Sequence, residues 1–180
     1  MFVGANGTGK SNLYRSMMLV QGAATGALGG LLAEEGGMPS ALWAGPRRQE
    51  PVRMRFGVVV DDWAYSLELG LPRPTEAAFV TDPIVKAERI DLNDRRRVTM
   101  LERKGPTAWL RNAEGRRVPY ELELLASETA LSQLRDPVAY PEQALLRNEL
   151  QGWRFYHHFR IDADSPLRQP QVGVCTPTLP

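Results

Sequence analysis

The sequence feature that most constrains this chain lies beside its N-terminus and consists of a glycine-rich stretch that ends in a lysine and a serine. It matches the pattern G-x-x-x-x-G-K-[ST] at every fixed position, and its residues are Gly4, Ala5, Asn6, Gly7, Thr8, Gly9, Lys10 and Ser11. The apolar residues 1–3 predict the end of a strand before this stretch, and apolar periodicity predicts a helix after Lys10. Strand, loop and helix therefore follow in the order that a phosphate-binding loop requires.

Such a loop binds a polyphosphate mainly through its main chain, because successive backbone N–H groups and the positive end of the helix point at the phosphate oxygens. We expect Lys10 to reach the β- and γ-phosphates of a nucleotide. We expect the Ser11 hydroxyl to bind Mg²⁺, which keeps phosphate oxygens and water as its other ligands. The sequence therefore predicts a nucleotide and Mg²⁺ site here.

Composition excludes several classes of protein. The 22 basic and 21 acidic residues leave a net charge of +1, so no overall field indicates a nucleic acid or an anionic membrane as partner, although local clusters remain open. The single cysteine, Cys175, excludes an intramolecular disulfide. We find no signal segment and no apolar stretch long enough to span a bilayer, and we expect a cytoplasmic protein without a membrane segment.

Periodicity divides the rest of the chain into elements. Leu13, Met17, Val20 and Ala24 form a helical stripe, and the glycines that follow leave its continuation to Glu35 open. Alternating runs predict an antiparallel sheet, with strands at 52–61, 63–71, 85–92, 97–103, 107–111 and 117–122. A helical turn within 125–134, a helix over 141–150, a strand over 153–159 and an irregular tail complete the prediction. We expect Leu145, Leu146 and Leu150 to form the apolar side of the helix over 141–150.

Three stretches together resemble the RecF/SMC-like branch of the ABC-type AAA ATPases, the group that also includes the OLD-family ATPases. They are residues 4–12, where Asn12 follows the serine, residues 35–45, and residues 130–137 followed by 153–156. The resemblance covers residues 1 to about 160, and within it the phosphate loop is the specific motif. It implies an α/β (α+β) fold, namely the N-terminal lobe of a P-loop NTPase with an antiparallel β subdomain.

The implied organisation has four parts. Residues 1–50 supply the strand, loop and helix of the phosphate site, 51–124 the β subdomain, 125–160 a glutamine loop with a helix and a strand of the same lobe, and 161–180 a loop or tail. The implied cofactors are ATP and Mg²⁺, held by residues 4–12. The family's glutamine, matched here to Gln133, contacts Mg²⁺ and the attacking water, so that Lys10 and Gln133 are the implied catalytic residues. A solvated glutamine on a short helix is the competing interpretation of Gln133.

The resemblance also implies partners and exposes two departures. The full-length form is implied to be a homodimer that hydrolyses ATP, with DNA or an effector protein as a candidate partner. Family members usually have a strand pair before the phosphate loop and a signature motif, an acidic strand and a histidine switch after the glutamine loop. We therefore expect this chain to be an incomplete lobe that binds Mg-ATP weakly and turns it over negligibly.

Two alternatives remain open. Residues 56–62 also fit an apolar run that ends in a metal-binding aspartate, which would make the chain a self-contained P-loop kinase or NTPase that uses Asp61. The alternation that resumes at Trp63 favours a tight hairpin turn instead, because a parallel sheet needs a crossover of about a dozen residues. The second alternative is a non-enzymatic interaction module.

Arginine clusters at 95–97 and 116–117 invite contact with nucleic-acid phosphates. We favour solvated turns there, because four acidic residues nearby dilute the charge, namely Asp91, Asp94, Glu102 and Glu114.

Overall fold

A six-stranded antiparallel sheet forms the centre of the computed structural model, which describes residues 8–42, 53–72, 82–112 and 114–155. Each strand pairs with its neighbours in sequence, so the sheet is a continuous meander. The strands are β1 (Arg53–Val60), β2 (Trp63–Gly70), β3 (Ile84–Asn93), β4 (Arg97–Lys104), β5 (Thr107–Arg111) and β6 (Arg117–Pro119). The antiparallel sheet predicted from alternating runs is therefore confirmed, and the chain has a mixed α/β fold.

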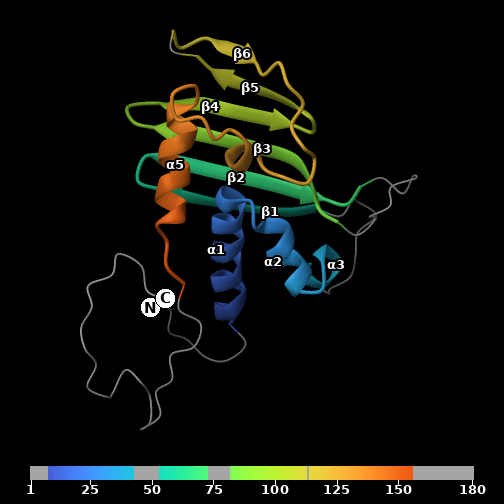
Figure 1. Ribbon diagram of the computed structural model, residues 1–180. Coiled ribbons are helices and arrows are strands. Elements are labelled where there is room, and N and C mark those ends of the chain that lie inside the picture. Colours follow the sequence, from blue (N-terminus) through green and yellow to red (C-terminus); the bar gives the residue numbers. More distant parts are fainter. Residues whose placement is uncertain (1–7, 43–52, 73–81, 113, 156–180) are drawn as a thin grey trace, which may run out of the picture.

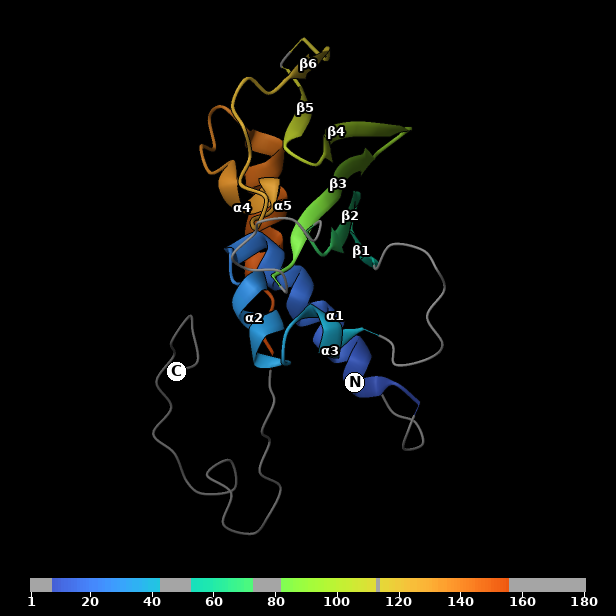
Figure 2. The same cartoon turned by 90° about the vertical axis from the view of Figure 1, so that its right-hand side faces the viewer.

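The described helices gather on one side of this sheet (Figures 1 and 2). They are α1 (Lys10–Thr25), α2 (Leu28–Glu34), α3 (Met38–Ala41), α4 (Ala130–Gln133) and α5 (Pro141–Gln151). We call the helix-covered side of the sheet the inner face and the opposite side the outer face. Alternate strand residues such as Tyr65, Leu67, Ile90, Leu101 and Leu110 point inward and form the core with the helices.

The first two strands form the hairpin that the sequence favoured. Val60 pairs with Trp63, so Asp61 and Asp62 make a two-residue turn. Asp61 has φ 49°, a left-handed conformation that aspartate tolerates better than most residues with a side chain. The turn is exposed and joins two antiparallel strands. In the described part of the chain, Asp61 therefore does not have the position of a metal-binding aspartate at the end of a parallel strand.

The first helix follows the predicted stripe in its second half only. Val20 and Ala24 are buried against the core, whereas Leu13 is 46% exposed. The helix ends at Gly26, whose φ of 84° breaks the backbone before α2, so one helix does not continue to Glu35. Glycine accepts this left-handed conformation without the steric cost that a Cβ would bring.

The last part of the described chain agrees with the sequence in its helices. The predicted turn within 125–134 is α4, and the predicted helix over 141–150 is α5. Leu145, which we expected on the apolar side of that helix, is 61% exposed. Residues 153–155 are not in a strand, while residues 156–159, the tail and the predicted strand at 1–3 lie outside the described residues.

Asp91 organises the outer face at the middle of the sheet. This carboxylate follows the inward Ile90 on β3 and therefore points outward, where it accepts hydrogen bonds from Arg89 (2.9 Å), Arg97 (2.5 Å) and Thr99 (2.7 Å). Burial alone would raise the pKa of Asp91, but these hydrogen bonds outweigh it and hold the pKa below its ordinary value. Asp91 is therefore an ionised anchor for two arginines.

We predict that Asp91→Asn lowers the free energy of unfolding near pH 7 by about 2 kcal/mol, because three donors lose an ionised acceptor. A lowered folded-state pKa contributes stability above the unfolded pKa of about 4, and this contribution disappears as the pH falls through the folded value. Urea denaturation should therefore show the two proteins converging as the pH falls below the unfolded pKa of about 4. Asp94→Asn, in the adjoining exposed turn, is the control; equal stability of Asp91→Asn and wild type at neutral pH would contradict the prediction.

Candidate nucleotide-binding site

The structure describes the predicted phosphate loop from Thr8 onward. Gly4, Ala5, Asn6 and Gly7 lie outside the described residues. Gly9 has φ 83°, in the left-handed region, and α1 begins at the next residue, Lys10. Ser11 and Asn12 are exposed in the first turn of the helix, and Lys10 is half-buried. The helix start that the motif predicts is therefore confirmed, with glycine at the position where the backbone needs it.

This helix start has the properties that a polyphosphate and Mg²⁺ require. Gly9 offers no side chain to cap the helix, and the first turn carries no acidic residue that would repel an anion. Sixteen residues of aligned peptide dipoles place partial positive charge at this end. Lys10 brings an ammonium group and Ser11 a hydroxyl ligand of the kind that Mg²⁺ accepts, so the donor set fits both groups.

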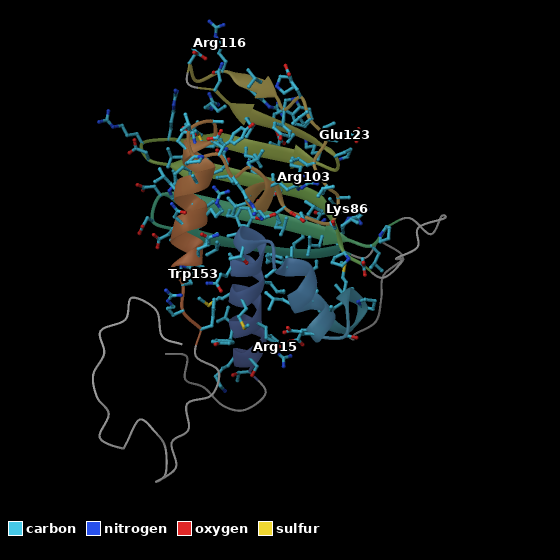
Figure 3. The ribbon with its side chains drawn as sticks, viewed as in Figure 1. Arg15, Lys86, Arg103, Arg116, Glu123 and Trp153 are labelled. Atoms are coloured by element: carbon cyan, nitrogen blue, oxygen red, sulfur yellow. The ribbon has the colours of Figure 1, made fainter. Side chains whose placement is uncertain are left out.

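The other end of α1 is anchored to α2 and to the residue before α4. Gly22 packs so tightly against α2 that an added Cβ would lie 2.6 Å from Leu31 Cδ1. Thr129 Oγ1 donates a buried hydrogen bond of 2.6 Å to the carbonyl of Ala23. Arg15, in the first half of the helix, lies away from the sheet (Figure 3). Helix α1 is thus held by its C-terminal half, while its N-terminal residues are exposed.

Gln133 lies on α4, and its carboxamide is bound by its own loop. Its Oε1 accepts a hydrogen bond from the backbone N–H of Leu125 (2.8 Å), and its Nε2 donates to the carbonyls of Glu128 (3.1 Å) and Thr129 (3.2 Å). These bonds close residues 125–133 into a compact turn. The expected contact of Gln133 with Mg²⁺ stays a prediction.

Gln133 lies far from the start of α1, where Thr8 and Gly9 are described. Its neighbour Thr129 touches Ala23 near the end of α1, thirteen residues after Lys10. At about 1.5 Å per residue, this separation corresponds to ~20 Å along the helix axis. Figure 2 shows the same arrangement, with α4 and the first turn of α1 at opposite ends of the helical layer.

Two buried charges hold α4 at its ends. The Glu88 carboxylate accepts hydrogen bonds from the backbone N–H groups of Ala130 (2.5 Å) and Leu131 (3.0 Å) and from the Tyr65 hydroxyl (3.0 Å). Arg147 on α5 donates to the carbonyl of Leu134 (2.7 Å) at the other end. The negative Glu88 meets the N–H groups at the start of α4, and the positive Arg147 meets a carbonyl at its end. Both contacts are favourable, because each charge is opposite to the partial charge of that helix end.

Arg103 completes this network beneath the 125–133 turn (Figure 3). Its fully buried guanidinium donates to the carbonyls of Gly105 (2.7 Å), Leu125 (2.8 Å) and Glu128 (2.6 Å), and its Nη1 lies 3.8 Å from Glu88 Oε2. Burial raises the pKa of Glu88, against the opposing effect of the N–H groups of α4 and of Arg103. Burial lowers the pKa of Arg103, because it disfavours the charged form of either group. The turn is therefore bound to the sheet by buried polar groups with multiple hydrogen bonds.

Sequence analysis did not single out Glu88, Arg103, Thr129 or Arg147. For the three charged residues, the available signal was a charge at an inward position of an apolar strand or helix. Arg147, for example, lies between Leu146 and Leu150. Charged residues are seldom fully buried unless they are paired, so such positions indicate a buried partner. The sequence did not show which segment supplies that partner.

Other groups bear less directly on a site. Among the described residues, no cluster of three or more His, Cys, Asp or Glu side chains forms a candidate metal site. Within the same ranges, every helix is too short or too polar to cross a bilayer. No protein-family model, curated protein or solved structure matches this chain. The inference of function therefore depends on the residues of this chain alone.

We predict that Gln133→Ala lowers the free energy of unfolding by about 1 kcal/mol, because the carboxamide links three backbone positions of its turn. Thermal or urea denaturation followed by circular dichroism measures the change. Gln151→Ala, which alters an exposed side chain at the end of α5, should stay within ~0.5 kcal/mol of wild type. Unchanged stability of Gln133→Ala would show that these hydrogen bonds contribute nothing in solution.

Proposed function

We propose that the chain is the ATP-binding lobe of a RecF/SMC-like ATPase and that residues 4–12 hold the ATP phosphates. The single observation that supports this most is the start of α1 at Lys10, directly after the left-handed Gly9, within a motif matched at every fixed position. On this proposal the full-length protein is a cytoplasmic homodimer that hydrolyses ATP.

Each residue has a defined task in this proposal. The Lys10 ammonium neutralises charge on the β- and γ-phosphates, and the backbone N–H groups at the start of α1 donate to phosphate oxygens. The Ser11 hydroxyl is a ligand for Mg²⁺, which supplies further neutralisation of the phosphates when bound. Gln133 must leave its hydrogen bonds with Leu125, Glu128 and Thr129 before it can contact Mg²⁺.

The alternative of a self-contained kinase or NTPase finds less support. Asp61 lies in the exposed hairpin turn between β1 and β2, in an antiparallel sheet. A metal-binding aspartate of a P-loop enzyme follows a strand that lies beside the strand of the phosphate loop. A non-enzymatic module remains the second candidate, and nucleotide binding separates it from the ATPase lobe.

We predict that isothermal titration calorimetry detects Mg-ATP binding by the 180-residue chain and that Lys10→Ala weakens it at least about tenfold, through loss of a charge-assisted contact of at least ~1.4 kcal/mol. Arg15→Ala removes an equal charge from the same helix and should leave the affinity within about twofold. Absence of binding at millimolar Mg-ATP would instead favour the interaction module, and equal binding by Lys10→Ala would contradict the phosphate-loop proposal.

A further inference from the structure

Exposed apolar side chains gather on one stretch of this chain, which runs along the helical side of the sheet (Figure 2). Among the described residues, six large apolar side chains are exposed, and four of them lie within residues 122–145. These four are Leu122 (69% exposed), Leu125 (60%), Val138 (89%) and Leu145 (61%). Apolar side chains that are exposed singly are ordinary, whereas a concentration of them indicates a surface that another molecule covers.

A pair of tyrosines joins the two halves of this stretch. Tyr120 lies directly after β6 and Tyr140 directly before α5, and their half-buried rings meet edge to face with the centroids 6.3 Å apart. Leu122 and Val138 are each two positions from one of these tyrosines, and two positions span at most ~7 Å of chain. Leu145 follows on the exposed side of α5. We call Tyr120, Leu122, Val138, Tyr140 and Leu145 the tyrosine surface.

Carboxylates surround the tyrosine surface. Residues 120–145 contain five acidic residues and one basic residue, Arg135, which leaves a net charge of −4 on this stretch. Four of the carboxylates lie within two positions of a residue of the tyrosine surface, namely Glu121, Glu123, Asp136 and Glu142. In the described part of the chain, none of these four forms an ion pair, whereas each carboxylate of the outer-face ion pairs, namely Glu68, Asp91 and Glu102, pairs with arginine. The four carboxylates can therefore pair with cations of another molecule.

The surroundings of Tyr140 show that apolar and polar groups meet at this surface. Burial raises the pKa of its hydroxyl, and the neighbouring Tyr120 and Asp136 raise it further. The hydroxyl is therefore a neutral hydrogen-bond donor near a carboxylate at neutral pH. Tyrosine suits such a position, because its ring is apolar and its hydroxyl is polar. Aromatic groups in the middle and charged groups around them are typical of a protein–protein interface.

We propose that the tyrosine surface binds a basic amphipathic helix of a partner protein. The apolar side chains of such a helix recur every three or four residues along one side, and they pack on the tyrosine pair and on Leu122, Val138 and Leu145. Its lysines and arginines, which flank the apolar side, meet the four carboxylates. The apolar contacts supply most of the affinity, and the charges select a basic helix over an acidic one.

Other occupants fit this surface less well. Strand addition needs an open sheet edge, and the neighbouring edge strand β6 spans three residues and ends at Pro119, which has no N–H. A nucleic acid would bring its phosphates close to the carboxylates. A second copy that docked through the same surface would bring acidic groups against acidic groups. This inference does not depend on ATP binding, because the residues proposed for ATP lie at and before the start of α1.

The test uses fluorescence anisotropy with a labelled peptide of leucine and lysine, about 14 residues long and patterned as an amphipathic helix, titrated with the 180-residue chain. A peptide of the same composition without that pattern should bind at least about tenfold more weakly. Leu122→Ser/Leu145→Ser should weaken binding of the patterned peptide at least about tenfold, because it removes apolar contacts. Leu13→Ser/Val59→Ser, which alters the other two exposed apolar side chains of the described residues, is the matched control and should stay within about twofold of wild type.

A second pair of variants tests the charges. Glu121→Gln/Glu123→Gln should reduce the salt dependence of binding, because two of the carboxylates that meet the lysines are neutralised. Asp61→Asn/Asp62→Asn, an equal loss of charge in the exposed turn between β1 and β2, should leave the salt dependence unchanged. An unchanged salt dependence in Glu121→Gln/Glu123→Gln would overturn the assignment of a basic partner.

Circular dichroism checks that each variant is folded, and Mg-ATP affinity is measured on the same samples, so that the two proposals fail separately. Absence of binding by the patterned peptide, or equal binding of the two peptides, would overturn the inference. So would wild-type affinity of Leu122→Ser/Leu145→Ser, or equal weakening in Leu13→Ser/Val59→Ser. A dimer that sedimentation velocity detects and that Leu122→Ser/Leu145→Ser dissociates would overturn it in favour of a second copy of this chain.

Discussion

The hydrogen bonds between Glu88 and the backbone of α4 support much of the described structure. A buried carboxylate without partners would be strongly destabilising, and Glu88 meets two backbone N–H groups and the Tyr65 hydroxyl. These bonds fix α4 against the inner face, and Thr129, one residue before α4, extends the connection to the carbonyl of Ala23. The position of α1 relative to the sheet therefore depends on a chain of polar contacts as well as on apolar packing.

Strand β3 divides two tasks between its faces. Glu88 points inward and binds a helix, while Asp91, three residues later, points outward and binds two arginines. This change of side follows from regular alternation, because residues an odd number of positions apart in a strand point to opposite faces. One strand thus contributes a buried carboxylate to the packed side of the sheet and another to its charged side.

Local pattern was sufficient to predict the strands, the hairpin turn at Asp61 and helix α5, because alternation and turn residues act within a few positions of the chain. It did not reveal the partners of Glu88, since Ala130 lies 42 positions away. The exposure of Leu13 and Leu145 was missed for a related reason. A helical stripe shows which side is apolar but not how far the neighbouring element extends. Gln133 could be named from the sequence, but the loop that holds its carboxamide could not.

The two outermost strands of the described sheet differ in how they resist intermolecular pairing. At one edge β6 spans three residues and ends at Pro119, which has no N–H to offer to an added strand. At the other edge β1 spans eight residues and carries Arg53 and Arg55. A second copy that docked edge to edge there would bring like charges together. The basic residues of this edge therefore also oppose aggregation through strand addition.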